Sequence, residues 1–252
     1  MINLGNIKIS DIRLGASQVK AVYFGSEQVW GGEEPGTIDD WLCFTAEEAN
    51  SSLHLDKVGT PAEIYLETST DGKTWKDYAW TENTGSEYTN LNVGDKVYFR
   101  AKTENQTIGN SSSNYYKFVM TGKIAASGNI QTLLKADGSR TDAPAYCYRN
   151  MFFGCSPLTT APELPATTLA DGCYYSMFSS CTSLTQAPEL PATTLADNCY
   201  SNMFYKCTSL PSAPALPATT LANSCYKYMF RYCSSLTSAP ALPATTLTDY
   251  CY

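Results

Sequence analysis

Cysteines are the residues of this chain with the widest choice of chemistry. There are ten, and nine fall in two columns of a regular grid. The columns are Cys147, Cys173, Cys199, Cys225, Cys251 and Cys155, Cys181, Cys207, Cys233. Thiols in such a pattern could form disulfides, bind a metal or fill an apolar interior. Their spacing is the evidence that separates these three alternatives.

The spacing argues against disulfides and metal binding. Cys147 and Cys155 are eight residues apart on a segment predicted to be helical. Eight helical residues rise about 12 Å, and packed helices lie roughly 8–10 Å apart, whereas a disulfide needs Cα atoms within about 7 Å. No Cys-x-x-Cys occurs, and His54 is the only histidine. We therefore expect buried, free cysteines and no metal site.

The other reactive side chains do not form a catalytic set. His54 lies in an alternating, strand-like run, and no nucleophile or orienting acid stands at a spacing from it that would indicate a catalytic motif. The acid pairs Glu33-Glu34 and Glu47-Glu48 fall in a linker and a predicted loop, not across a cleft. The sequence therefore predicts a non-enzymatic protein without catalytic, cofactor-binding or metal-binding residues.

The element that positions the cysteines is a repeat of 26 residues that starts at Cys147. Cys147, Met151, Cys155 and Leu158 are spaced by 4, 4 and 3 residues, which predicts one face of a helix. An Asp or Asn precedes each later unit as a predicted N-cap, at positions Asp171, Asp197, Asn223 and Asp249. A fixed period of this length is typical of a solenoid.

The repeat carries a resemblance to a known family. Met151-Phe152-x-x-Cys155-x-x-Leu158 and its three copies resemble the BspA-like class of leucine-rich repeat. The resemblance covers residues 147–252. It implies an α/β leucine-rich-repeat solenoid that binds host cells, matrix proteins or other bacteria, and it implies no catalytic residues.

The remaining chain reads as β-rich. Short alternating runs and the hairpin signal Asp71-Gly72 predict a small immunoglobulin-like β-sandwich. The predicted fold is thus multi-domain, with a β-rich module and a sandwich ahead of the α/β solenoid. The predicted segments are a β-rich attachment module (1–31), a linker (32–38), the sandwich (39–114), an N-terminal cap with a helical turn at 130–134 (115–146) and the repeats (147–252).

A second resemblance concerns the N-terminus. Residues 9–15, 19–26 and 29–30 resemble N-terminal modules of tail and fibre proteins of phages and prophages from gut bacteria. This implies a virion-associated tail or head fibre protein that attaches to virion proteins through this module and binds a bacterial or host surface through its repeats. The alternative is a BspA-like adhesin of the bacterial cell surface. Such an adhesin requires export, and residues 1–6 show no signal-peptide pattern.

Differences between the nearly identical repeats mark the candidate ligand-contact face. They fall mainly after Cys-Tyr and after Met-Phe, at positions expected to face outward. Tyr, Arg and Lys on a rigid scaffold are typical of recognition surfaces, and the alternative is a solvated face free to vary. The candidate residues are Arg149, Phe153, Tyr175, Tyr205, Lys206, Lys227, Tyr228, Arg231 and Tyr232. A protein or a glycan on a cell surface would fit as the partner.

Composition limits the other partners. The net charge of −7 and a pI near 4.8 argue against nucleic acid as a partner. No apolar run reaches the roughly 18–20 residues of a membrane helix, so no membrane insertion is expected. The sequence stops inside a repeat at Tyr252, and we expect further residues or a contact to cover that edge. Oligomeric state is left open, with a homo-oligomer among the alternatives.

Overall fold

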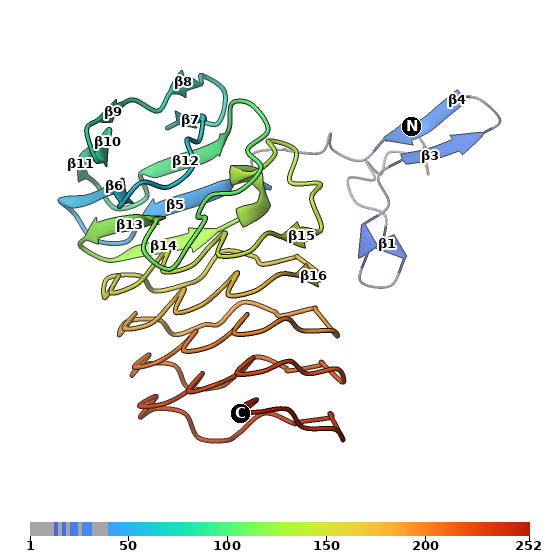
Figure 1. Cartoon of the computed structure of the whole chain (residues 1–252). Helices are drawn as coiled ribbons and strands as arrows, with labels where there is room; N and C mark the ends of the chain where they lie inside the picture. The colour runs from blue at the N-terminus through green and yellow to red at the C-terminus, as the bar shows by residue number, and fades with distance from the viewer. Residues whose placement is uncertain (1–12, 15–16, 19–20, 25–26, 32–39) are drawn as a thin grey trace.

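The computed structural model describes residues 13–14, 17–18, 21–24, 27–31 and 40–252, with side chains from residue 40 onward (Figure 1). Near the N-terminus, β1 (Arg13–Leu14) pairs with β2 (Ser17–Gln18), and β3 (Ala21–Phe24) pairs with β4 (Glu27–Gly31), both antiparallel. The expected strand at 7–10 and the expected linker at 32–38 lie outside the described residues.

Two antiparallel sheets follow, each with five strands. The first has the order β11-β6-β10-β9 with β13 on β6, and the second has the order β14-β5-β12-β7-β8. Their strands are β5 (Leu42–Ala46), β6 (Ser51–Val58), β7 (Leu66–Ser69), β8 (Lys76–Asp77), β9 (Trp80–Thr81), β10 (Thr84–Gly85), β11 (Tyr88–Leu91), β12 (Lys96–Ala101), β13 (Tyr115–Thr121) and β14 (Ile124–Ser127). The sheets lie above the layered repeats in Figure 1.

Aromatic side chains join the two sheets. Alternate residues of β13 are buried, so that Phe118 points inward, as the period of two in a strand requires. The Phe118 ring lies 4.6 Å from that of Phe44 on β5 and 5.3 Å from that of Phe99 on β12. Contacts of this kind fill the space between the sheets with rings and add stability beyond that expected from the apolar area they bury.

The repeats contain no α-helix within the described residues, so the predicted α/β leucine-rich-repeat solenoid is wrong. The segments 147–158, 173–184, 199–210 and 225–236, here called the turn segments, are successions of turns. Two residues of each segment, four positions apart, have a positive φ, as at Asn150 (57°) and Gly154 (73°). A right-handed helix cannot include such residues. A spacing of four residues fits a repeating turn as well as it fits a helix.

Backbone hydrogen bonds of the turn segments alternate between two directions. The N–H of Met151 donates to the carbonyl of Tyr148 in the same repeat, at 3.2 Å. The next N–H, of Phe152, donates to the carbonyl of Met177 in the following repeat, at 2.9 Å. The alternation recurs in the later repeats. Half of the N–H groups therefore need the neighbouring repeat as their partner, which a helix would not require.

The predicted N-caps are also wrong, because no helix begins there. The residues before each Cys contribute their backbone to the contacts between repeats instead. The N–H of Tyr146 donates to the carbonyl of Asp171, and the N–H of Gly172 donates to that of Asp197. Asp197 accepts a further hydrogen bond on its side chain, from the N–H of Asn223 at 2.9 Å.

Two ladders of parallel rings run through the repeats. In one, Phe118 of β13 stacks on Phe152, and Phe178, Phe204 and Phe230 follow. Neighbouring ring centroids are 5.2–5.7 Å apart, with interplanar angles of 13° or less. The second ladder joins Tyr148, Tyr174, Tyr200, Tyr226 and Tyr252. Each repeat thus buries its rings against the rings of its neighbours.

The sandwich is continuous with the first repeat. The N–H of Phe118 donates to the carbonyl of Met151, and Ile124 of β14 forms a parallel bridge with Leu158. The short strands β15 (Asp142–Ala143) and β16 (Thr168–Leu169) also pair in parallel. A 3₁₀ turn, η1 (Ile130–Leu133), stands where the helical turn was predicted. The strand β13 pairs with β6 in the first sheet, and β14 pairs with β5 in the second. The predicted boundary between residues 114 and 115 therefore separates strands that are paired in these two sheets.

The Phe ladder generates a stability prediction. Phe178→Ala removes a fully buried ring with a stacked neighbour on each side, so we expect the free energy of unfolding to fall by about 3–5 kcal/mol. Phe230→Ala should cost less, because that ring is partly exposed and stacks on Phe204 alone among the Phe rings. Urea denaturation measures both variants. Equal losses would contradict a ladder that stabilises through stacking between repeats.

Candidate functional site

All ten cysteines are free and buried, which confirms the prediction that they fill the interior. Four thiols donate to the backbone of the layer before them, and Cys225 donates to the carbonyl of Cys251 in the layer after it. Cys155 donates to the carbonyl of Phe118 at 3.0 Å, and Cys181 donates to that of Phe152 at 3.1 Å. Burial raises the pKa of Cys147, Cys155 and Cys199 to about 12. Because the thiolate is the reactive form, these positions do not offer thiol chemistry.

The other candidates for chemistry are dispersed. His54 on β6 lies 3.4 Å from a carboxylate oxygen of Asp56 and 3.9 Å from one of Glu87. Glu47 accepts a hydrogen bond from the Thr159 hydroxyl at 2.7 Å, so it ties the sandwich to the first repeat. Glu33-Glu34 lie outside the described residues. Within residues 40–252 no three His, Cys, Asp or Glu side chains gather in a group that could hold a metal.

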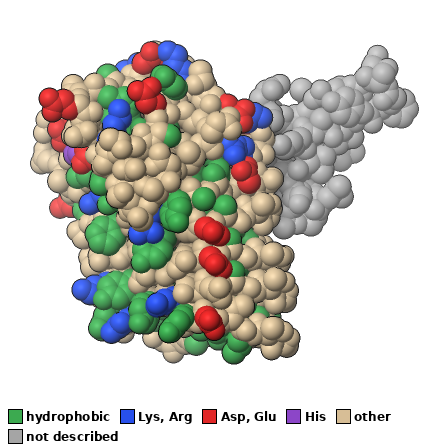
Figure 2. Space-filling model, viewed as in Figure 1, with side chains coloured by type: hydrophobic (Ala, Val, Ile, Leu, Met, Phe, Trp, Pro, Cys, Tyr) green, Lys and Arg blue, Asp and Glu red, His purple; other side chains and the backbone are tan. Residues whose placement is uncertain are grey.

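Six of the nine predicted contact residues come together on the third and fourth repeats. With Tyr250 they form what we call the cation–ring cluster, whose members are Tyr205, Lys206, Lys227, Tyr228, Arg231, Tyr232 and Tyr250. The rings of Tyr205 and Tyr232 meet edge to face at 5.3 Å. Figure 2 shows blue and green side chains interleaved over the lower repeats, where this cluster lies.

Cations of the cluster lie over its rings. The Arg231 guanidinium is 5.0 Å from the ring centroid of Tyr228 and 4.8 Å from that of Tyr232. It also donates to the Tyr232 hydroxyl at 3.0 Å. The Lys227 amine is 5.5 Å from the ring of Tyr228 and 4.6 Å from that of Tyr250. Attraction between cations and ring faces therefore positions these charges at the surface.

The other three predicted residues lie in separate pairs. Arg149 covers the ring of Tyr175, with its guanidinium carbon 3.9 Å from the ring centroid. Phe153 is 42% exposed and lies 5.8 Å from the amine of Lys117 on β13. The first two repeats thus present paired side chains, whereas the last two present a connected cluster.

The expectation that all variable positions face outward is wrong for three serines. Ser176, Ser179 and Ser201 occupy variable positions, and each is buried. At equivalent positions, a small side chain such as that of Ser is buried in one repeat, whereas a Tyr, Lys or Arg side chain in another repeat extends to the surface. Conversely, the sequence comparison missed Tyr250, which is 72% exposed. The position one residue before the repeated Cys could have indicated it, because this position varies between Tyr146, Gly172, Asn198, Ser224 and Tyr250.

Several members of the cluster occupy positions of positive φ. Lys206 (60°), Tyr228 (55°), Tyr232 (66°) and Tyr250 (52°) all have this conformation. In other repeats the same positions hold mostly Gly, Asn or Ser. A bulky residue there costs about 1–2 kcal/mol, and such strain is typical of functional sites.

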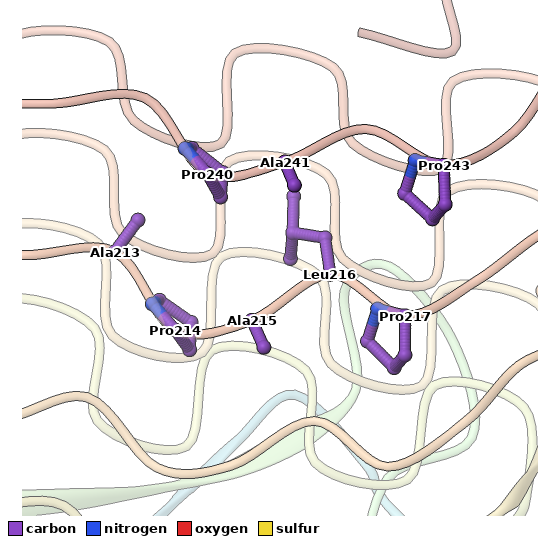
Figure 3. Close-up of a pocket in the computed structure, with 8 residues that line it drawn as sticks. All are labelled: Ala213, Pro214, Ala215, Leu216, Pro217, Pro240, Ala241 and Pro243. Atoms are coloured by element: carbon purple, nitrogen blue, oxygen red, sulfur yellow. The ribbon is translucent and has the colours of Figure 1, made fainter.

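Two hollows lie near the C-terminal repeats. One, of about 340 Å³, borders the cluster and is lined by Tyr228 and Arg231 together with apolar Met229, Phe230 and Leu242. The other, of about 280 Å³, lies on the Ala-Pro-x-Leu-Pro segments, here called the proline segments (161–165, 187–191, 213–217 and 239–243). There Pro214 and Pro217 of one repeat stand next to Pro240 and Pro243 of the following one (Figure 3). This hollow has no charged side chain, and a similar hollow of about 360 Å³ one repeat earlier has only Glu189. The cluster is therefore the better candidate for recognition.

Comparison of the chain with protein-family models, curated proteins and solved structures gives no match. No helix in the described part of the chain is both long enough and apolar enough to cross a membrane.

The buried thiols predict loss of stability at alkaline pH. Their folded pKa of about 12 exceeds the ordinary value of 9.0, so their contribution is complete below about pH 9 and is lost as the pH rises toward 12. At pH 10.5 each such thiol should lower the free energy of unfolding by about 2 kcal/mol relative to pH 7. Urea denaturation at both values measures this. Cys155→Ala should show a smaller difference between them, and an unchanged difference would contradict the assignment.

The strained position of Tyr228 generates a second prediction. Tyr228→Asn places there the residue type found at Asn150 and Asn202 of other repeats. Relief of about 1–2 kcal/mol of strain should offset the cation–ring attraction that is lost, of about 0.5–1 kcal/mol. Calorimetry should therefore show an unchanged or higher melting temperature. Tyr200→Asn, which opens the buried Tyr ladder, should lower it strongly. A clear loss for Tyr228→Asn would mean that its ring stabilises the fold.

Proposed function

We propose that the protein is a non-enzymatic adhesion protein whose repeats bind a bacterial or host surface through the cation–ring cluster. The observation that carries this proposal is the cluster itself. Three cations and four tyrosines gather there at positions where other repeats have mostly small or polar residues. Interior packing requires none of these side chains, because both ring ladders and the cysteines are formed by other residues.

The proposed setting is a virion, in which the protein serves as a tail or head fibre component. The N-terminal segment supports this through its resemblance to phage and prophage modules, and the proposal assigns it contacts with virion proteins. The resemblance of the repeat pattern to BspA-like proteins supports adhesion. The same adhesion function on a bacterial cell surface is the alternative setting. Immunogold labelling of the native protein on virions and on cells separates the two.

Alanine at the cluster tests the adhesion function. Arg231→Ala and Tyr232→Ala remove one cation and one ring that is 53% exposed, without opening the interior. In typical interfaces a minority of residues, enriched in Tyr and Arg and clustered near the centre, each cost more than about 1 kcal/mol of binding when truncated. The double variant should therefore reduce binding of the labelled protein to a panel of intestinal bacteria and epithelial cells by at least tenfold, with its melting temperature unchanged. Flow cytometry measures the bound fraction.

The matched control likewise removes one cation and one exposed tyrosine, but from the sandwich. Lys73 and Tyr65 are both exposed there, and Tyr65 is 56% exposed. The Lys73→Ala and Tyr65→Ala double variant should bind as the unmodified protein does. Full binding by the cluster variant, or equal losses in both variants, would contradict the proposal that this edge makes the contact.

A further inference from the structure

Charge is distributed unevenly over the repeats. The turn segments contain four basic residues and no acidic residue, although the whole chain carries a net charge of −7. The basic residues are Arg149, Lys206, Lys227 and Arg231. The acidic residues of the repeats lie in the proline segments and before the conserved Cys, at Glu163, Asp171, Glu189, Asp197 and Asp249. The edge formed by the turn segments is therefore positive on an acidic protein.

Within residues 40–252 no carboxylate neutralises the positive charges of this edge. In residues 40–252 none of its four cations forms an ion pair with a carboxylate, in contrast to Arg100, which pairs with Glu67 at 2.6 Å. The rings that hold the cations leave their net charge intact. Cations presented in this way attract anionic groups by charge complementarity.

The backbone fixes the spacing of these cations. The N–H of Lys206 donates to the carbonyl of Arg231 at 2.9 Å, so these residues are neighbours in adjacent repeats. The N–H of Asn202 donates to the carbonyl of Lys227 at 2.8 Å, which anchors the third cation in the same way. The cluster thus offers a row of cations separated by ring faces.

We infer that the ligand of the cation–ring cluster is an acidic polysaccharide, a conclusion that rests on the adhesion function proposed above. Carboxylate or sulfate groups along such a chain would pair with Lys206, Lys227 and Arg231. The apolar faces of its sugar rings would pack on the exposed rings of Tyr228 and Tyr232. A protein partner is less well matched, because lysine is depleted in protein–protein interfaces, whereas two of the three cations of the cluster are Lys206 and Lys227.

The test compares ligands that differ in one property each. Three acidic polysaccharides serve as probes: polygalacturonate, hyaluronate and chondroitin sulfate. Fully methyl-esterified polygalacturonate keeps the sugar rings and removes the charge, whereas poly-L-glutamate keeps the charge and removes the sugar rings. Calorimetric titration of the full chain should show binding to at least one acidic polysaccharide at least tenfold tighter than to either comparison polymer, with an affinity that falls as salt increases.

Variants separate the two kinds of contact. The double variant Lys206→Gln and Arg231→Gln should weaken binding of the acidic polysaccharide at least tenfold and reduce its salt dependence. Tyr228→Asn with Tyr232→Gly, which introduces residues found at these positions in other repeats, should weaken binding without reducing the salt dependence. Lys73→Gln with Lys123→Gln removes two exposed cations of the sandwich and should change nothing.

Each outcome has a defined meaning. Binding to none of the three acidic polysaccharides, or equal binding to either comparison polymer, would overturn the inference. Competition of these polysaccharides with binding to intact cells distinguishes a wrong ligand class from a wrong adhesion function. If the protein binds intact cells through Arg231 and Tyr232 and none of the acidic polysaccharides competes, the adhesion function stands and the assigned ligand class is wrong. If no cell binds, the adhesion function itself fails.

Discussion

The repeats depend on hydrogen bonds that a single repeat cannot complete. In the first three turn segments, every second backbone N–H between the two cysteines finds its acceptor in the following repeat, as the N–H of Phe178 does at the carbonyl of Met203. A buried N–H without an acceptor would cost a large part of what the ring contacts contribute. Repeats must therefore form against an existing neighbour. The sandwich makes the same contact with the first repeat, because the N–H of Phe118 donates to the carbonyl of Met151 and its ring stacks on that of Phe152.

This constraint divides each repeat into an invariant part and a free part. The stacked Phe and Tyr rings and the cysteines have like neighbours above and below, so a change in one repeat would disturb two others. Side chains at the edge, such as those of Arg231 and Tyr232, point away from these ladders and can differ between repeats. The architecture therefore concentrates variation on a rigid edge, which is where a recognition surface can arise without loss of the fold.

The edge also shows how a surface charge is held without an acidic partner. A carboxylate beside Arg231 would neutralise the charge, whereas the rings of Tyr228 and Tyr232 position it and leave it available. Tyr228 and Tyr232 provide this contact from backbone positions that disfavour them, because both have a positive φ. Strain, exposure and unpaired charge thus coincide in one part of the molecule, on residues that contribute nothing to the ladders.

The sequence by itself determined the 26-residue period and the buried cysteines, because identical neighbours impose the same environment on each copy. It also marked six members of the cation–ring cluster as variable positions, but only the structure showed that these six lie together. It also indicated the strands of the sandwich, since alternation such as that around Phe118 reflects one buried face. It could not determine the local structure of the repeat, because Cys147, Met151 and Cys155 recur at a spacing that a helix and a four-residue turn share. Only the tertiary structure decided between them, because the acceptors that favour the turn belong to the neighbouring repeat. For the same reason the burial of Ser176, Ser179 and Ser201 emerged only once the repeats were placed on one another.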